Sequence, residues 1–169
     1  MVGMNIIGFT GHRRPHDEAF VISALRDLIP EMVESHSMVA GACGMAWGSD
    51  LDFADAVVDN GVDLWAFIPF PSQADRWGAD DRERRRRLLS SASSSTTFSD
   101  VYDISAYRRR DEAIVRSSTI LIAALDGNVV RGGTFWTAQF ARGRGLPVFV
   151  VDSWEHTVTT PAPTLWDSF

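Results

Sequence analysis

The chain has 169 residues, 45% of them hydrophobic, which is enough for one domain with its own core. Its net charge of −6 argues against non-specific duplex DNA binding as the main task, and its single cysteine excludes a disulfide framework and a four-cysteine zinc site. All sixteen basic residues are arginine, which excludes enzymes that need a Walker A, Schiff-base or kinase-type lysine.

The first half of the chain alternates short apolar runs with helical patterns. Strands are predicted at residues 5–10, 38–40 and 63–69. Helices are predicted at 17–35, with a kink at Pro30, and at 49–60. In the second helix Ser49 is the expected N-cap, because Asp52 three residues on resembles the partner of a capping box.

The second half continues the same alternation after a charged stretch. A loop from residue 70 leads into an exposed helix near Asp80, and a Ser/Thr-rich connector leads to a strand at 96–101. A helix at 104–117, a strand at 119–125, a helix from an N-cap at Thr134 to Arg142 and a strand at 147–152 follow. We expect one domain at 1–152 and an extended tail at 153–169, with Pro161 and Pro163.

Strands that alternate with helices predict an α/β protein, a Rossmann-like three-layer sandwich with a mostly parallel central sheet. In such a sheet ligands bind beyond the carboxyl ends of the strands, where the strand order reverses. Three loops are then expected at that edge: TGHRRP (10–15), GACGMAWGSD (41–50) and DGNVVRGGT (126–134). Each is glycine-rich and leads to a helix N-terminus, so together they predict a ligand that carries phosphate or carboxylate.

Several side chains of these loops have two interpretations. Arg13 could bind a phosphate bidentately and His12 could donate a hydrogen bond or a proton, or the arginines of this loop are simply solvated. Asp50 could bind a ribose hydroxyl or a base, or merely face the helix dipole. Cys43 is expected to be a buried structural residue rather than a nucleophile, since no histidine is close to it in sequence.

Two arginine runs also have alternative interpretations. Residues 82–87 could form a nucleic-acid patch, although such a run is more often a solvated helix face. Arginines 108–110 open a helix and oppose its dipole, which favours a role in binding a ligand or partner. Four tryptophans flank the loops and serve the core or stack on a base: Trp47, Trp65, Trp77 and Trp136.

Six motifs occur in an order and spacing that resemble the YpsA-like branch of the SLOG superfamily, over residues 5–152. They are Thr10-Gly11-His12-Arg13, 41–48, Ile68-Pro69-Phe70, Gln73 with Trp77, 107–118 and Gly132-Gly133-Thr134. That superfamily includes DprA-type DNA-processing proteins and the LOG phosphoribohydrolases, which are lysine-decarboxylase-like in their Rossmann fold. The resemblance implies a domain that binds a nucleotide or an ADP-ribose-like derivative. We expect no obligatory cofactor and no metal. The ligand-binding residues expected are Thr10, Gly11, His12, Arg13, Gly41, Gly44, Trp47, Gly48, Ser49, Asp50, Pro69, Arg110, Gly132, Gly133 and Thr134.

The sequence departs from the LOG pattern at its final motif. LOG enzymes have a segment similar to P-G-G-x-G-T-x-x-E, whose glutamate takes part in glycosidic bond cleavage. Here the stretch is RGGTFWT (131–137), and Thr137 stands where the glutamate would be. The phosphate-binding part of the motif is therefore kept and its acid/base part is not.

Three functions remain open. The first is a nucleotide-binding sensor or accessory domain, and the second is an N-glycosidase, for which Asp50, Asp111 and Asp126 are the candidate catalytic carboxylates. The third is DprA-like binding of single-stranded nucleic acid, and a homo-oligomer is compatible with each of them. The N-terminus has no basic region of a signal peptide and no run could span a membrane, so a cytoplasmic location is expected.

Overall fold

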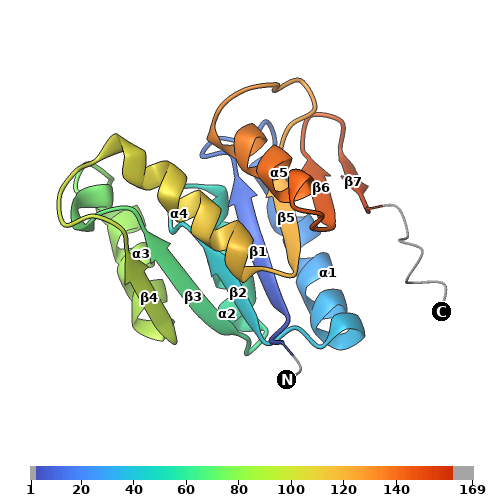
Figure 1. Cartoon of the computed structure of the whole chain (residues 1–169), viewed down its shortest axis with the longest axis horizontal. Coiled ribbons are helices and arrows are strands. Elements are labelled where there is room, and N and C mark those ends of the chain that lie inside the picture. Colours follow the sequence, from blue (N-terminus) through green and yellow to red (C-terminus); the bar gives the residue numbers. More distant parts are fainter. Residues whose placement is uncertain (1–2, 162–169) are drawn as a thin grey trace.

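In the computed structural model, which describes residues 3–161, the strands of one sheet follow the order β4-β3-β2-β1-β5-β6-β7 (Figure 1). The pairs from β4 to β6 are parallel, and β7 is antiparallel to β6. The strands are β1 (Ile6–Gly11), β2 (Ala40–Cys43), β3 (Asp63–Ile68), β4 (Ser94–Thr97), β5 (Ile120–Ala124), β6 (Val148–Asp152) and β7 (Thr157–Thr159).

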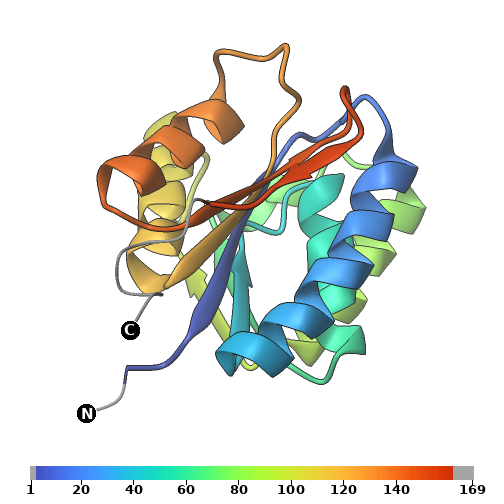
Figure 2. The ribbon, with the colours of Figure 1, turned by 90° about the vertical axis from the view of Figure 1, so that its right-hand side faces the viewer.

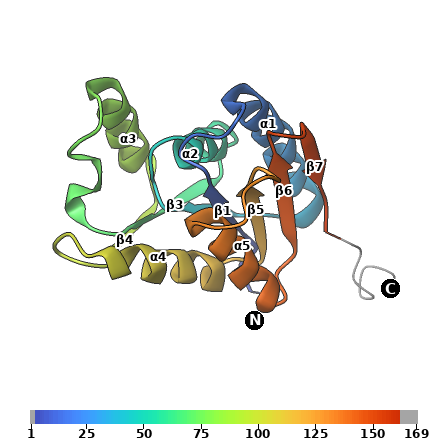
Figure 3. The ribbon, with the colours of Figure 1, turned by 90° about the horizontal axis from the view of Figure 1, so that it is seen from above.

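Helices cover both faces of this sheet and make the outer two layers. Viewed from above, α1, α2 and α3 lie on one face, and α4 and α5 lie on the other (Figure 3). The helices are α1 (Glu18–His36), α2 (Ser49–Asp59), α3 (Ala79–Ser91), α4 (Ile104–Ser117) and α5 (Gly133–Gly143), with a 3-10 turn, η1, at Pro71–Ala74. The predicted α/β, Rossmann-like fold class is confirmed. None of the helices within residues 3–161 has the length and hydropathy needed to cross a membrane.

The central strands are buried on both faces, which explains why their sequences are continuous apolar runs. All five residues of β5 are buried, and β1 is buried except at Gly11, its last residue. The helices bury one stripe each. In α1, for example, Val21, Leu25 and Ile29 are fully covered against the sheet.

The strand order reverses between β1 and β5, since the chain builds β1 to β4 outward and then returns to the other side of β1. Gly11 at the end of β1 lies opposite Ala124 at the end of β5. Figure 2 shows the loop between β5 and α5 extending beyond the sheet at the same end as the loop after β1. The predicted binding edge is therefore the place where these loops meet.

Three elements differ from the sequence-based expectation. Strand β2 occupies Ala40–Cys43 instead of 38–40 and so includes Gly41, which the sequence pattern assigns to a loop. Glycine is needed at this strand position because α2 packs closely on it: a Cβ there would lie 2.5 Å from the Val57 side chain of α2. Strand β4 is Ser94–Thr97 rather than 96–101, and all its residues are exposed. Part of the expected tail forms β7, which pairs with β6; Pro163 lies outside the described residues.

Candidate functional site

A cavity of about 680 Å³ lies at the carboxyl edge of the sheet, over the ends of β1 and β5. Its walls come from the loops after β1, β2 and β5 and from α4. The residues predicted from the sequence that line it are Thr10, Gly11, His12, Arg13, Gly44, Asp50, Arg110, Asp111, Asp126, Gly132, Gly133 and Thr134. Segments more than a hundred residues apart thus share one wall.

Other predicted ligand residues lie outside the cavity wall within the described chain. Gly41 packs under α2, and Pro69 follows β3. Trp47 is covered on one side by the Arg14 guanidinium, whose Cζ lies 4.9 Å from the ring centroid. Their roles in binding stay predictions. Cys43 is buried, and burial raises the pKa of its thiol, which agrees with the structural interpretation.

Gly48 and Ser49 join the first two loops instead of lining the cavity. Gly48 has φ +86°, and a Cβ on it would collide with the carbonyl oxygen of Arg13. The Ser49 hydroxyl donates to the carbonyl oxygen of His12 at 2.6 Å. Ser49 is therefore not the N-cap that the capping-box pattern predicts: the N-cap is Gly48, and α2 starts without a side-chain cap because the Ser49 hydroxyl bonds another loop.

Arg110 brings a buried cation to the cavity. Its side chain is almost covered, its Nη1 donates to the Gly44 carbonyl at 2.8 Å, and its Nε donates to Asp111 Oδ1 at 2.7 Å. A Cβ at Gly44 would collide with this guanidinium, so glycine lets the arginine lie against the backbone of the second loop. The close approach of the Arg110 guanidinium is thus the physical reason for glycine at position 44 of that loop.

Two carboxyl groups of the cavity have pKa values above their usual range. Asp50 accepts a hydrogen bond from the Ala46 N–H at 3.0 Å, and burial raises its pKa to about 6 although Arg110 acts to lower it. Burial also raises the pKa of Asp111, against the opposing effects of Arg110 and of Thr137 beside it. With a pKa of about 6, the Asp50 carboxyl can give or take a proton close to neutral pH.

The third carboxylate candidate is held by the structure. Asp126 accepts hydrogen bonds from the hydroxyl and the N–H of Ser153, at 2.6 and 3.0 Å, and from the N–H of His16 at 2.9 Å. Burial acts to raise the pKa of Asp126, but these hydrogen bonds outweigh it and the pKa lies below its usual value. The backbone N–H of Asp126 donates to His12 Nε2 at 3.1 Å, so this nitrogen carries no proton, and burial lowers the pKa of His12.

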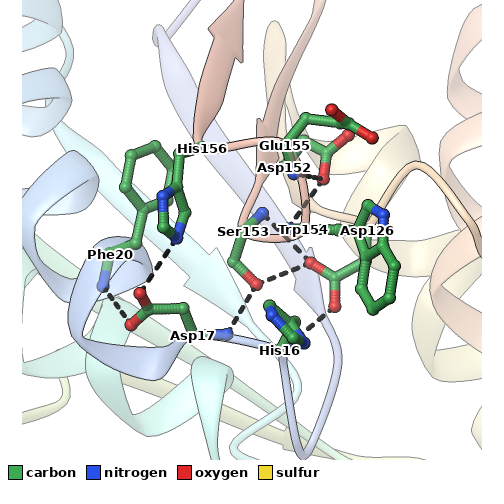
Figure 4. A network of polar contacts seen from close by, with 9 residues as sticks. All are labelled: His16, Asp17, Phe20, Asp126, Asp152, Ser153, Trp154, Glu155 and His156. Atoms are coloured by element: carbon green, nitrogen blue, oxygen red, sulfur yellow. Dashed lines mark hydrogen bonds and ion pairs between the residues drawn. The ribbon is translucent and has the colours of Figure 1, made fainter.

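The same contacts fix the first and third loops to the turn after β6 (Figure 4). Ser153 accepts from the N–H of Asp17 at 3.0 Å, and Asp17 in turn caps α1 by accepting from the Phe20 N–H at 3.1 Å. His156 Nε2 lies 3.0 Å from Asp17 Oδ2. The turn between β6 and β7 therefore braces two walls of the cavity, a role that the prediction of an extended tail does not contain.

The side of the cavity next to α5 suits an anion. The N-cap of α5 is Gly132, with φ +93° and no side-chain cap, so the predicted N-cap Thr134 lies inside the first turn. The N–H groups of this turn carry the positive end of the helix dipole. Arg13 and Arg131 line the cavity with them and add positive charge.

Tyr102 and Ile104 line the cavity and are absent from the predicted set. They are 66% and 75% exposed, although they are large apolar side chains, and Phe70 packs edge-on against Tyr102 and Tyr107. In the sequence the two residues flank Asp103, the N-cap of α4, where apolar residues usually signal a helix start. Their exposure at a cavity mouth is visible only in the structure.

The chain matches no protein-family model and no curated protein. Its fold is similar to solved structures of DNA processing protein A. The structure from Streptococcus pneumoniae has a TM-score of 0.64 at 17% identity, over 87% of this chain and 50% of that one. The Helicobacter pylori protein, described with a single-stranded DNA binding mode, has a TM-score of 0.66 at 15% identity, over 88% and 65%.

The chain also resembles the molybdenum cofactor carrier protein of Chlamydomonas reinhardtii, with a TM-score of 0.54 at 16% identity over 87% of this chain and 76% of that one. It spans between half and two thirds of the two DNA processing proteins. At these identities the likeness shows the fold.

Proposed function

We propose that the chain is a nucleotide-binding SLOG domain of the YpsA-like branch, with a sensor or accessory role, and that the cavity over β1 and β5 holds a nucleotide or an ADP-ribose-like ligand. The observation that carries this proposal is the convergence of three loops and the uncapped start of α5 on one cavity of about 680 Å³. A volume of this size suits a ligand of nucleotide dimensions.

The charges of the cavity support an anionic ligand. The chain is acidic overall, yet the lining contains Arg13, Arg14, Arg110 and Arg131. Of these, Arg110 is held by Asp111, whereas Arg13 and Arg131 form no ion pair within residues 3–161. Tyr102 at the mouth offers an exposed aromatic face for a base.

Isothermal titration calorimetry with AMP, ADP and ADP-ribose tests the proposal. Gly132→Asp places a carboxylate at the start of α5 and Arg13→Ala removes a cation, so each weakens binding about 10-fold or more. Gly61→Asp is the matched control, because Gly61 also has a positive φ and open space around it but lies between α2 and β3. Absence of binding to every ligand of the panel would refute the proposal.

A second candidate function, cleavage of an N-glycosidic bond, is favoured by Asp50 and Asp111, whose raised pKa values put two proton-transfer groups in one cavity. Asp111 also lies beside Thr137, the position where LOG enzymes have glutamate. Free base released from a nucleotide panel, measured by chromatography, tests it. Asp111→Asn reduces the rate 10²–10⁴-fold if Asp111 transfers the proton, and exposed Asp100→Asn is the control.

A third candidate, single-stranded DNA binding, follows from the fold shared with DNA processing protein A, and the H. pylori protein is described as binding such DNA. Band-shift titration with oligonucleotides at two salt concentrations tests it. Binding through phosphate contacts weakens as salt rises, so an affinity insensitive to salt contradicts this mechanism.

A further inference from the structure

The three consecutive arginines of α4 lie in three different environments. Arg110 is buried in the wall of the cavity, and Arg109 pairs with the N-cap Asp103 at 3.2 Å. Arg108 lies outside the cavity wall, and its Cζ is 4.6 Å from the ring centroid of Trp136 on α5. The cavity therefore accounts for Arg110 and leaves the role of Arg108 open.

Arg108 is the first member of a row of side chains between α4 and α5, two helices that lie side by side (Figure 1). Trp136 stacks on Phe140, with ring centroids 5.2 Å apart and an angle of 11° between the planes. The Cζ atoms of Arg116 and Arg144 lie 5.5 and 5.7 Å from the Phe140 centroid. Arginines from α4 and from the end of α5 thus hold their guanidinium groups against one pair of aromatic rings.

The hydrogen-bond donors of this row remain available. Arg108, Arg116 and Arg144 are exposed, whereas the two rings are half-buried. Within residues 3–161 Arg108 and Arg144 form no ion pair, and Arg116 has only a contact of 3.8 Å with Glu112. A guanidinium that packs over a ring keeps its N–H edges free, so it can bind a phosphate while the ring holds it in place.

The surroundings of the row are positive although the chain is acidic. Residues 104–117 and 133–144 contain six arginines and two acidic residues, whereas α1, α2 and α3 together contain eleven acidic residues and six arginines. Figure 3 shows these two groups of helices on opposite sides of the sheet. This charge asymmetry favours a polyanion at the face formed by α4 and α5.

The arginine run of α3 is different, because carboxylates of the protein neutralise most of it. Arg84 and Arg87 bond Asp55, and Arg86 bonds Glu83, each at 3.3 Å or less. These pairs agree with the interpretation of this run as a solvated helix face. The face of α4 and α5 is therefore the better candidate for contacts with phosphates.

We propose that the face formed by α4 and α5 binds single-stranded nucleic acid, with Arg108, Arg116 and Arg144 on its phosphates and its bases stacked along the row of guanidinium groups and rings. A single strand carries both regular negative charge and uncovered base faces, whereas the bases of a duplex are stacked on their neighbours. The eleven-residue helix α5 is about 16 Å long, which gives the row room for a few nucleotides. This inference goes beyond the proposed nucleotide binding and gives the third candidate function a location outside the cavity.

Fluorescence anisotropy with a labelled oligothymidylate of about twelve nucleotides, titrated with the whole chain at several salt concentrations, tests the inference. Arg108→Gln and Arg144→Gln each weaken binding about 10-fold, because each variant loses a charge-assisted contact. Each also reduces the slope of log affinity against log salt concentration by about 0.7, the value for one phosphate of a single strand. Arg26→Gln is the matched control and keeps both values, since Arg26 is an exposed arginine of α1 on the opposite face.

Three outcomes would overturn the inference: no binding at low salt, an equal effect of Arg26→Gln and Arg108→Gln, or equal affinity for the oligothymidylate and for a duplex of the same length. Polyglutamate that displaces the probe as well as unlabelled oligothymidylate does would also overturn it, because the face would then accept an acidic protein without any contribution from bases.

Calorimetry with AMP separates this inference from the proposed function. Arg108→Gln keeps the affinity for AMP, because Arg108 does not line the cavity. Oligonucleotide binding that depends on Arg108, without any binding of nucleotides or ADP-ribose, supports this inference and refutes the nucleotide cavity. Binding of AMP without binding of the oligonucleotide has the opposite meaning.

Discussion

Gly48 and Gly132 form a natural pair for measuring how closely the loops of the site are packed. Each is the N-cap of an eleven-residue helix, and their φ angles are +86° and +93°. They differ in surroundings: a Cβ on Gly48 would meet the backbone of Arg13, whereas a Cβ on Gly132 would meet nothing within 4 Å. Replacement of each by alanine therefore separates backbone strain from a collision between two loops.

The expected costs follow from this difference. Gly132→Ala carries only the strain of a positive φ in a residue with a Cβ, about 1–3 kcal/mol of unfolding free energy. Gly48→Ala carries a similar strain and must also move the Arg13 carbonyl, which overpacking data put at about 1–3 kcal/mol more. The Ser49 hydrogen bond to the neighbouring His12 carbonyl, at 2.6 Å, is weakened when this loop moves.

Urea denaturation of the two variants and the wild type, without ligand, measures the difference. The midpoint falls further for Gly48→Ala than for Gly132→Ala, with an unchanged dependence on urea concentration. Equal losses would refute the close approach of the first two loops. A loss in Gly132→Ala larger than in Gly48→Ala would show that the start of α5, and not the contact at Arg13, is the tightly packed point of the site.

Three further predictions concern charge and hydrogen bonding. The pKa of Asp50 is raised in the folded state to about 6, so the stability that protonated Asp50 contributes is present at low pH and is lost as pH rises from about 4 to 6. Relative to the wild type, Asp50→Asn therefore gains about 3 kcal/mol of unfolding free energy between pH 4 and 7, measured by urea denaturation. An equal pH dependence in both proteins would contradict this. Arg84→Ala leaves the buried Asp52 carboxylate without its cation and lowers the unfolding free energy by about 3–5 kcal/mol. Arg86→Ala, in an exposed pair on the same helix, lowers it by at most about 1 kcal/mol, and thermal denaturation measures both losses. Similar losses in the two variants would argue against burial at Asp52. Ser153→Ala removes hydrogen bonds to Asp126 and Asp17 and costs about 1–3 kcal/mol by chemical denaturation, and a loss no larger than that of exposed Ser90→Ala would contradict the bracing role of the turn after β6.

The sequence predicted most of the strands and helices because burial on both sides makes the central strands continuous apolar runs. It was less accurate where that signal is absent: the three-residue exposed strand β7 was not predicted, and β4, which consists of serine and threonine only, was predicted with shifted bounds. Both lie at the edges of the sheet, where pairing with one neighbour defines the strand and the composition does not.

The helix starts at the site show a similar limit. Ser49 and Thr134 have the side chains of N-caps, yet the N-caps are Gly48 and Gly132. At the first site the Ser49 hydroxyl bonds a loop thirty-seven residues away, and at both sites a glycine adopts a φ that other residues avoid. A local rule cannot include a partner that is distant in sequence.

The sequence by itself determined the fold class, the three glycine-rich loops and their placement at one edge of the sheet. It could do so because the positions of glycines and capping residues and the spacing of apolar residues are properties of the local sequence. Only the tertiary structure decided which carboxylates remain available: Asp126 is bound by Ser153 and His16, while burial raises the pKa values of Asp50 and Asp111. It likewise decided that Arg85 reaches the second loop through Gln73. Hydrogen bonds, burial and charge depend on residues that the chain brings together only when it folds.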